Sequence, residues 1–499
     1  MRSSTQSKKI AKGAFIVLVS LIIGKGLSYL YTALLAKTGS SNYGLISLGF
    51  VIISILTIIS MVGMNTGVMR YTAYYKGKKD KSRIKGAFLS SLKIVLPVSI
   101  TLSVFLILFS DFISTKLFHN IELSPILKIL AVSIPISVIT NVILDMMTGL
   151  QNLFYSNFSK EIIDRILKII FIFIAIFLGY GILGVATSYL IAVIMTFIVT
   201  FYFLNKKTFP LFSKKIKTVY YTRKLLIFSY PLLFIGIITL LVKWTDVLMI
   251  GFFRTTSEVG IYNVALPTAN LLIIVPAALM ALFTPIIVEL YSKGDKKNIK
   301  LTSKRISKWI FYLNLPIFFV LLLLSSDFLR IMFGNEYVAG GVSLVILLFG
   351  YIFHSLSHIP SSTLLMIKKT KTIFLMGLIS LIVNVALNYL LIPKYGINGA
   401  AISTSLSLII GSILLLISSY KFNKFQPLSI SYIKPIISGV IVSIIFYFLM
   451  NLFIMNSIIK IALFSIIFLV LYLVILYLLR FFDKEDKEIL QFLLKKFRA

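Results

Sequence analysis

A lysine lies in the middle of the first long apolar segment of the sequence. Lys25 is about twelve residues from either end of segment 12–36, or roughly 18 Å along a helix. A charged side chain at mid-bilayer costs roughly 2.5–3.5 kcal/mol, so the ammonium needs an anion, a paired acid or water. Gly24 and Gly26 leave room beside it. Lys25 is therefore either a cation that contacts an anionic substrate or one half of a buried ion pair between helices.

A second group of polar side chains lies in segment 225–250. Lys243 and Asp246 are three residues apart and share a helix face, where they could neutralise each other. The functional alternative makes Asp246 a protonation or ion site and Lys243 a second contact for the anionic ligand. Trp244 lies between them and is either an interfacial anchor or a ring that stacks on a sugar.

Five further side chains are secondary candidates because they lie within apolar segments or near their ends. Lys93 is near enough to the helix end to snorkel, and Arg70 and Asp145 lie where water is close. His354 and His358 are four residues apart, but two nitrogens without a third ligand predict no metal site. A proton relay is the functional hypothesis for this pair, since histidine titrates near neutral pH.

The elements that hold these residues are apolar and of membrane-spanning length. The 499 residues are 59% hydrophobic and 13% charged, with no cysteine, so disulfides and thiolate sites are excluded. A soluble fold could not bury so much apolar surface, and we predict an all-α polytopic membrane protein. Fourteen transmembrane helices are expected, at 12–36, 44–69, 86–109, 126–149, 160–178, 181–204, 225–250, 259–288, 309–332, 341–366, 372–392, 396–419, 433–453 and 458–480.

The positive charge follows the loops. The formal net charge is +34, and 40 of the 50 lysines and arginines lie in or near the N-terminus, every second loop and the C-terminal tail. This positive-inside pattern predicts cytoplasmic termini and a multi-pass protein of the cell membrane, with membrane lipids and no nucleic acid as partners. The sequence holds no phosphate-binding loop and no large outer domain, so we expect no enzyme, no cofactor and no metal.

An internal repeat divides the chain. Residues 180–186 recur at 395–401, residues 110–112 at 326–328, and Gly44 at Gly260, all offset by 215 or 216. Six helices per repeat predict two parallel lobes related by an axis along the membrane normal, with the substrate between them. The predicted parts are an N-terminal lobe 1–205, a basic linker 206–224, a C-terminal lobe 225–420, two additional helices in 421–482, and an amphipathic tail 483–499, for which a solvated tail is the alternative.

The motifs resemble the polysaccharide export branch of the multidrug/oligosaccharidyl-lipid/polysaccharide exporter superfamily. Residues 36–44 are similar to its R-x-L-G-x-x-x-Y/F-G motif, residues 246–262 to D-x-x-x-I-G…V-G-x-Y, and residues 395–400 to its Y-G-I-x-G-A stretch. The resemblance implies a flippase that moves a polyprenyl-linked oligosaccharide to the outer leaflet by alternating access, for surface polysaccharide or glycoprotein assembly. Glycan-assembly proteins and H⁺ or Na⁺ are the further partners it implies.

Two departures separate the chain from other branches. Lipid II flippases carry Arg-Asp where Tyr31-Thr32 stands, and multidrug exporters often carry an acid where this chain has Lys25. A deep cation suits a lipid-linked diphosphate, with Lys25 and Lys243 as its contacts. The alternative is a cation-coupled multidrug or metabolite exporter, which needs an essential acid such as Asp246. A membrane enzyme or an assembly scaffold would need an acid cluster in a loop, which the sequence lacks.

Overall fold

The computed structural model describes residues 19–20, 22–211, 213, 215–424, 432–452, 457–479 and 481. The predicted tail 483–499 and the start of the first predicted span lie outside these ranges. Within them, all regular secondary structure is helical. Packing of Cα atoms divides the chain into two compact units: unit 1 is Met1–Val264 with Asn388–Ala400, and unit 2 is Ala265–Leu387 with Ala401–Ala499. The predicted lobes follow the sequence repeat instead, and they stay a prediction.

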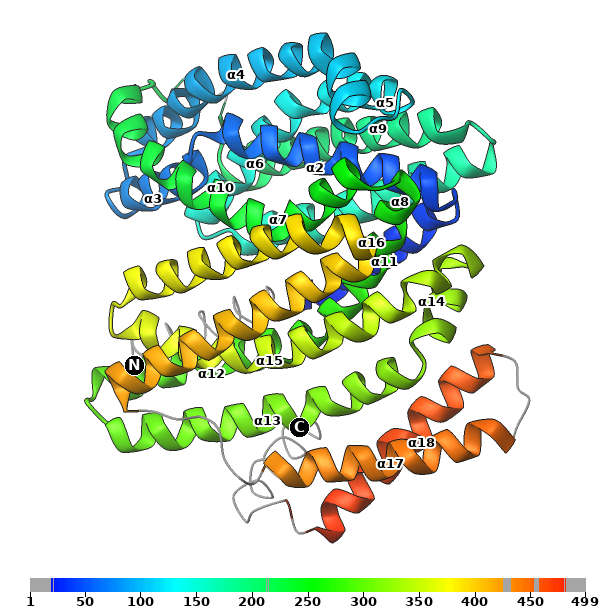
Figure 1. Ribbon diagram of the computed structural model, residues 1–499. Coiled ribbons are helices and arrows are strands. Elements are labelled where there is room, and N and C mark those ends of the chain that lie inside the picture. The colour runs from blue at the N-terminus through cyan, green and yellow to red at the C-terminus, as the bar shows by residue number, and fades with distance from the viewer. Residues whose placement is uncertain are drawn as a thin grey trace. The chain divides into compact units, whose positions relative to one another are not determined.

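Unit 1 is a bundle built around α2, α4, α6 and α9 (Figure 1). The long helix α10 packs against α2, α3 and α4 within this unit. Its helices are Ile22–Ala36, α2 Ser40–Met61, α3 Met64–Gly77, α4 Lys81–Phe112, α5 Leu123–Ala131, α6 Ser133–Gly149, α7 Leu153–Asn157, α8 Asp164–Phe177, α9 Gly181–Tyr202, α10 Thr222–Phe253 and the first part of α11 Thr256–Ala269. Short π-helical turns extend three of them, at Ile113–Leu117, Phe158–Ile163 and Phe203–Thr208.

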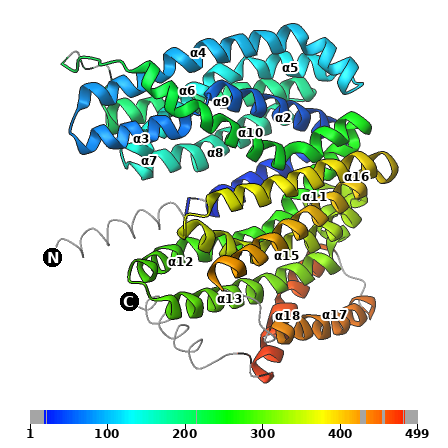
Figure 2. The same cartoon turned by 60° about the vertical axis from the view of Figure 1, so that its left-hand side comes forward.

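Unit 2 holds the remaining helices. Within it, α13 packs against α12, α15 and α17, and α17 lies beside α18 (Figures 1 and 2). The bounds are α12 Ile274–Ser292, α13 Lys296–Leu323, α14 Ser325–Phe333, α15 Gly341–Met366, α16 Thr370–Asn423, α17 Ile433–Leu452 and α18 Ser457–Leu478, with 3-10 turns at Asn270–Ile273 and Asn335–Gly340. The middle of α16, Asn388–Ala400, belongs to unit 1.

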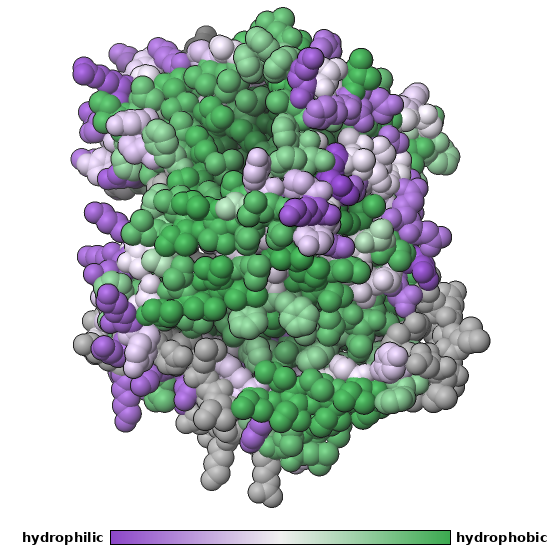
Figure 3. Space-filling view, viewed as in Figure 1, coloured by the Kyte–Doolittle hydropathy of each residue, from purple (hydrophilic) through white to green (hydrophobic). Residues whose placement is uncertain are grey.

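The described helices are those of a multi-pass membrane protein. Seven are long and apolar enough to cross a membrane, and nine crossings result if two bent helix pairs each count as one. Three shorter apolar helices are Ile22–Ala36, Ile433–Phe448 and Leu463–Leu478. On the face shown in Figure 3, apolar side chains cover the middles of the helices and hydrophilic ones gather at their ends. The fourteen crossings and their orientation stay a prediction.

The predicted span 44–69 is broken in the structure. Val62 and Gly63 both have positive φ, at 48° and 70°, and they separate α2 from α3. A Cβ on Gly63 would lie 2.1 Å from the carbonyl oxygen of Ser229 on α10. The glycine therefore permits both the break and the close approach of α10.

Helix α16 is two antiparallel arms and not one rod. Its 54 residues would reach about 80 Å if straight, well beyond the apolar thickness of a bilayer. Gly396 interrupts it, with φ 55° and ψ −133°. The Oγ of Ser380 donates to the carbonyl of Ser407, and the Nδ2 of Asn384 donates to Thr404, as the arms of a hairpin require. The two arms appear in yellow and orange in Figures 1 and 2.

Helices α2 and α11 cross at a pair of glycines within unit 1. A Cβ on Gly44 would lie 1.7 Å from the carbonyl oxygen of Thr256, and a Cβ on Gly260 would lie 2.0 Å from that of Ser40. Hydroxyl groups hydrogen-bond across the crossing, at 2.8 Å from Ser40 to Ser257 and at 3.0 Å from Ser41 to Thr256. Because Gly44 and Gly260 are repeat mates, this contact is nearly symmetric.

Candidate functional site

Three cations from three helices of unit 1 lie close enough to interact electrostatically. Lys243 on α10 is repelled by both Lys25, on the helix Ile22–Ala36, and Arg165, on α8. The side chains of Lys25 and Lys243 are exposed, and the Nε of Arg165 is buried without a hydrogen-bond partner in the part of the chain that the structure describes. Like charges gathered in this way attract an anion. We call Lys25, Arg165 and Lys243 the cation cluster.

No carboxylate of the described ranges forms an ion pair with the cation cluster, and that of Glu161 is close by, since its Oε2 would lie 2.9 Å from a Cβ on Gly24. Asp164, next to Arg165 in the sequence, pairs instead with Lys168 at 2.8 Å. No ion pair forms to Lys25 or Lys243 within those ranges, so the structural alternative of a buried ion pair at Lys25 is not observed there.

Arg165 is a member of the cluster that sequence reasoning missed. It lies within the predicted span 160–178, where three basic residues fall close together and suggest the charged end of a helix. The structure places π-helical turn Phe158–Ile163 immediately before α8, which shifts the phase of the side chains that follow. Its position five residues inside a predicted apolar span was the signal available in the sequence.

Aromatic rings lie beside the cluster. Tyr31 is stacked on Phe50 with centroids 6.5 Å apart, and Phe50 contacts Tyr189 at 4.6 Å. The hydroxyl of Tyr31 is buried, within electrostatic range of Arg165, and without a hydrogen-bond partner among the residues described. This ring layer adds apolar surface and a free hydroxyl next to the positive charges.

Lys243 and Asp246 face different partners. The ammonium of Lys243 lies over the ring of Trp244, 4.6 Å from its centroid, as a cation–π contact. Asp246 is 6% exposed, and its carboxylate accepts hydrogen bonds from the hydroxyl of Tyr262, at 2.7 Å, and from the Nδ2 of Asn388, at 2.8 Å. Mutual neutralisation of Lys243 and Asp246 is therefore not the arrangement found. The functional interpretations of Trp244 and Asp246 stay predictions.

The secondary candidates are dispersed. In unit 1 the guanidinium of Arg70 lies 4.2 Å from the ring of Phe228, and the ammonium of Lys93 lies 3.8 Å from the ring of Tyr220. One carboxylate oxygen of Asp145 on α6 is buried without a hydrogen-bond partner in the described chain, and Lys160 is within electrostatic range.

The histidine pair lies on α15 of unit 2. The rings of His354 and His358 are 5.5 Å apart and edge to face, and the Nδ1 of His354 is 3.4 Å from the hydroxyl of Ser357. The described residues hold no group of three or more His, Cys, Asp or Glu side chains that could bind a metal. A proton relay through the pair stays a prediction.

The described helices are those of a multi-pass membrane protein, and comparisons with known proteins specify its class. The chain is similar to lipid II flippase MurJ in an inward closed conformation, with TM-score 0.72, 18% identity, and coverage of 92% of this chain and 98% of that one. At that identity the likeness shows the fold alone. A MatE family model also matches residues 231–390.

A family model described as polysaccharide biosynthesis protein matches residues 10–291, more than half of the chain, and the chain belongs to this family. It is a transporter of the flippase type within the multidrug/oligosaccharidyl-lipid/polysaccharide exporter superfamily, and not an enzyme. An uncharacterized membrane protein MJ1068 of Methanocaldococcus jannaschii is 26% identical over 80% of this chain and 81% of its own. A putative O-antigen transporter of Shigella flexneri is 25% identical over 76% of this chain and 89% of its own.

Proposed function

We propose that the protein flips a lipid-linked oligosaccharide, carried on a polyprenyl diphosphate, from the cytoplasmic to the outer leaflet. The observation that carries this proposal is the cation cluster, three positive charges from three helices with no carboxylate paired to them in the described chain. The family and the putative O-antigen transporter support a glycan as the cargo. A lipid without a phosphate group would supply no counter-charge to the three cations, whereas a lipid diphosphate would.

In this proposal each part of the site has its own contact with the substrate. Lys25, Arg165 and Lys243 bind the diphosphate, because charge-assisted hydrogen bonds are strongest where water is scarce. Trp244 and the ring of Tyr31 face the first sugars. Fourteen crossings, cytoplasmic termini and two parallel six-helix lobes complete the proposal, and the lobes move by alternating access.

The test is flipping of a fluorescent polyprenyl-diphosphate oligosaccharide in proteoliposomes. Replacing Lys25, Arg165 or Lys243 by Ala is expected to lower the rate at limiting substrate about 10- to 100-fold, since a hydrogen bond to a charged group contributes about 1.5–3 kcal/mol. Lys116→Ala, which removes an exposed lysine at the end of a π-helical turn, is the matched control. Wild-type rates in all three cluster variants would reject the role of the cluster.

We also propose that Asp246 couples transport to H⁺ or Na⁺, because an acid buried among helices that the family places in a membrane is a candidate for a coupling site. This role would also suit the alternative function, a cation-coupled exporter of drugs or metabolites. Flipping is measured with and without a proton or sodium gradient, in the wild type and in Asp246→Asn. Equal rates in all conditions remove ion coupling. Drug resistance on expression, without glycolipid flipping, would favour the exporter.

A further inference from the structure

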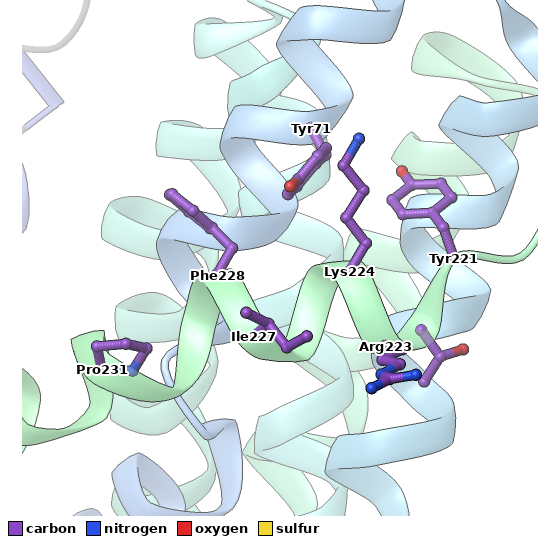
Figure 4. Close-up of a pocket in the computed structure, with 8 residues that line it drawn as sticks. Tyr71, Tyr221, Arg223, Lys224, Ile227, Phe228 and Pro231 are labelled. Carbon is purple, nitrogen blue, oxygen red and sulfur yellow. The ribbon is translucent and has the colours of Figure 1, made fainter.

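A groove opens in unit 1 where α10 begins. It measures about 930 Å³ and lies between α3 and α10, lined by Tyr71, Tyr221, Arg223, Lys224, Ile227 and Phe228. In Figure 4 the side chain of Lys224 stands between the rings of Tyr71 and Tyr221. We call it the α10 groove.

The walls of the α10 groove are held in place. The Tyr71 ring is 5.6 Å from that of Tyr221 and 5.8 Å, edge on, from that of Phe228. The backbone of Tyr221 donates to the hydroxyl of Ser90, and its phenol donates to the carbonyl of Arg83 at 3.1 Å. Burial raises the pKa of Tyr221, so the phenol stays protonated and keeps this bond. The aromatic sides of the groove are thus fixed by defined contacts within unit 1.

Its positive charge is not compensated by the protein. Arg223 and Lys224 lie in the first turn of α10, where no side chain caps the helix and where the helix dipole disfavours cations. Arg70 adds a third charge beside Phe228. In the described part of the chain none of the three forms an ion pair, and the nearby acid Asp80 is held by Arg83 at 3.6 Å. An anion would relieve both the repulsion and the uncapped helix start.

The lining changes from charged to apolar along α10. Arg223 and Lys224 come first, followed by Ile227, Phe228 and Pro231, so the change takes about 12 Å of helix. A phospholipid has the same order, with a phosphate at the membrane surface and an acyl chain below it. A soluble anion would use the charges and leave the apolar part empty.

We propose that the α10 groove binds an anionic phospholipid of the bilayer, with its phosphate on Arg223 and Lys224 and its acyl chain along Ile227 and Phe228. Basic pockets between transmembrane helices at the inner surface commonly bind such headgroups. Each cation contributes roughly fivefold to affinity, which suits an abundant bilayer lipid better than a scarce carrier lipid.

This site is distinct from the proposed transport site. Lys224 and Lys243 are nineteen residues apart on α10, or about 28 Å along the helix. The bound lipid holds the first turn of the helix whose far half carries Lys243 and Asp246. Lipid binding is measurable without transport, so its failure and the failure of the flippase proposal are distinguishable.

The experiment measures lipid binding to the full-length protein by native mass spectrometry in detergent. Phosphatidylglycerol, phosphatidylcholine, inorganic phosphate and undecaprenyl diphosphate are titrated in parallel. We expect phosphatidylglycerol to bind best, and its Kd to rise roughly 30-fold in the double variant Arg223→Gln/Lys224→Gln. The matched control Lys215→Gln/Lys217→Gln removes two exposed charges from the preceding segment and should keep the wild-type Kd.

A photoactivatable phosphatidylglycerol, cross-linked to the wild-type protein, gives a second readout that does not depend on how a variant folds. Labelled peptides should cover residues 221–231. The proposal is overturned by equal Kd values in the two double variants, by cross-links confined to other segments, by inorganic phosphate that displaces the lipid, or by tighter binding of undecaprenyl diphosphate at the same residues.

Discussion

The crossing of α2 and α11 should not tolerate a single methyl group. A Cβ at position 44 would lie 1.7 Å from the carbonyl oxygen of Thr256, whereas an ordinary contact needs at least 3.4 Å. Both helices must therefore move apart locally by more than 1.5 Å. The backbone oxygen is part of a helix and cannot rotate away, so Gly44→Ala forces this separation.

The cost follows from what the separation breaks. The hydrogen bonds from Ser40 to Ser257 and from Ser41 to Thr256, now 2.8 and 3.0 Å, would lengthen beyond the usual limit. Hydrogen bonds between transmembrane helices contribute about 0.6 kcal/mol each, and overpacking costs about 1–3 kcal/mol. We therefore expect Gly44→Ala to destabilise the protein by about 2–4 kcal/mol, and Gly260→Ala by a similar amount, because its Cβ would meet Ser40 at 2.0 Å.

The assay is unfolding in detergent, followed by circular dichroism across a denaturant series. Gly77→Ala is the matched control, since no atom lies within 4 Å of its Cβ and alanine favours a helix by about 0.5–1 kcal/mol. If Gly44→Ala and Gly260→Ala both unfold like Gly77→Ala, the close crossing is not how these helices pack, and the argument fails.

Two further predictions concern the backbone and a helix cap. Gly396→Ala should cost about 1–3 kcal/mol in the same unfolding assay, because φ 55° with ψ −133° is open only to glycine and the new Cβ would lie 2.5 Å from Glu258; Gly377→Ala, with open space around it, should not. The hydrogen bonds from Asn298 hold the pKa of the Asp295 carboxyl below its usual value, so this cap stabilises α13 above the ordinary carboxyl pKa and is lost as pH falls through the lower, folded one. The stability difference between wild type and Asp295→Ala should therefore vanish in acid, and a difference that persists there would contradict the assignment.

Hydropathy predicted that the fold consists of membrane-spanning helices, but it did not predict where these helices break. Apolar length and composition suffice to indicate helices that cross a membrane, since the bilayer imposes both. They do not show where such a segment breaks, because the break at Val62 and Gly63 depends on two residues with positive φ and on the close approach of Ser229. Residues 44–69, expected as a single span, are therefore divided between α2 and the start of α3.

Part of the internal repeat could be recognised in the sequence because the backbone requires glycine at equivalent positions of both copies. Gly181 and Gly396, offset by 215, have φ of 61° and 55°; Gly181 begins α9, and Gly396 lies at the kink within α16. Only glycine adopts such angles readily, so the same residue recurs in both copies.

The candidate site stays a prediction, and the sequence suggested only two of the three residues of the cation cluster. Lys25 was selected because it lies in the middle of the predicted span 12–36. Lys243 was selected because it lies in the segment that corresponds to this span in the repeat. The sequence analysis did not select Arg165, and only the packing of α8 brings it within electrostatic range of Lys243. Likewise the spacing of Lys243 and Asp246 suggested a pair, whereas tertiary contacts direct the carboxylate to Tyr262 and Asn388.

If Lys25, Arg165 and Lys243 bind the substrate as proposed, their gathering would make transport responsive to voltage. Moving one elementary charge across the full membrane field is worth about 2.3 kcal/mol per 100 mV. In the proposed mechanism the empty protein would present the three positive charges of the cation cluster to that field, and a bound diphosphate would cancel most of them. Empty and loaded forms therefore experience different electrical forces, so a resting potential would drive the return step and the delivery step unequally.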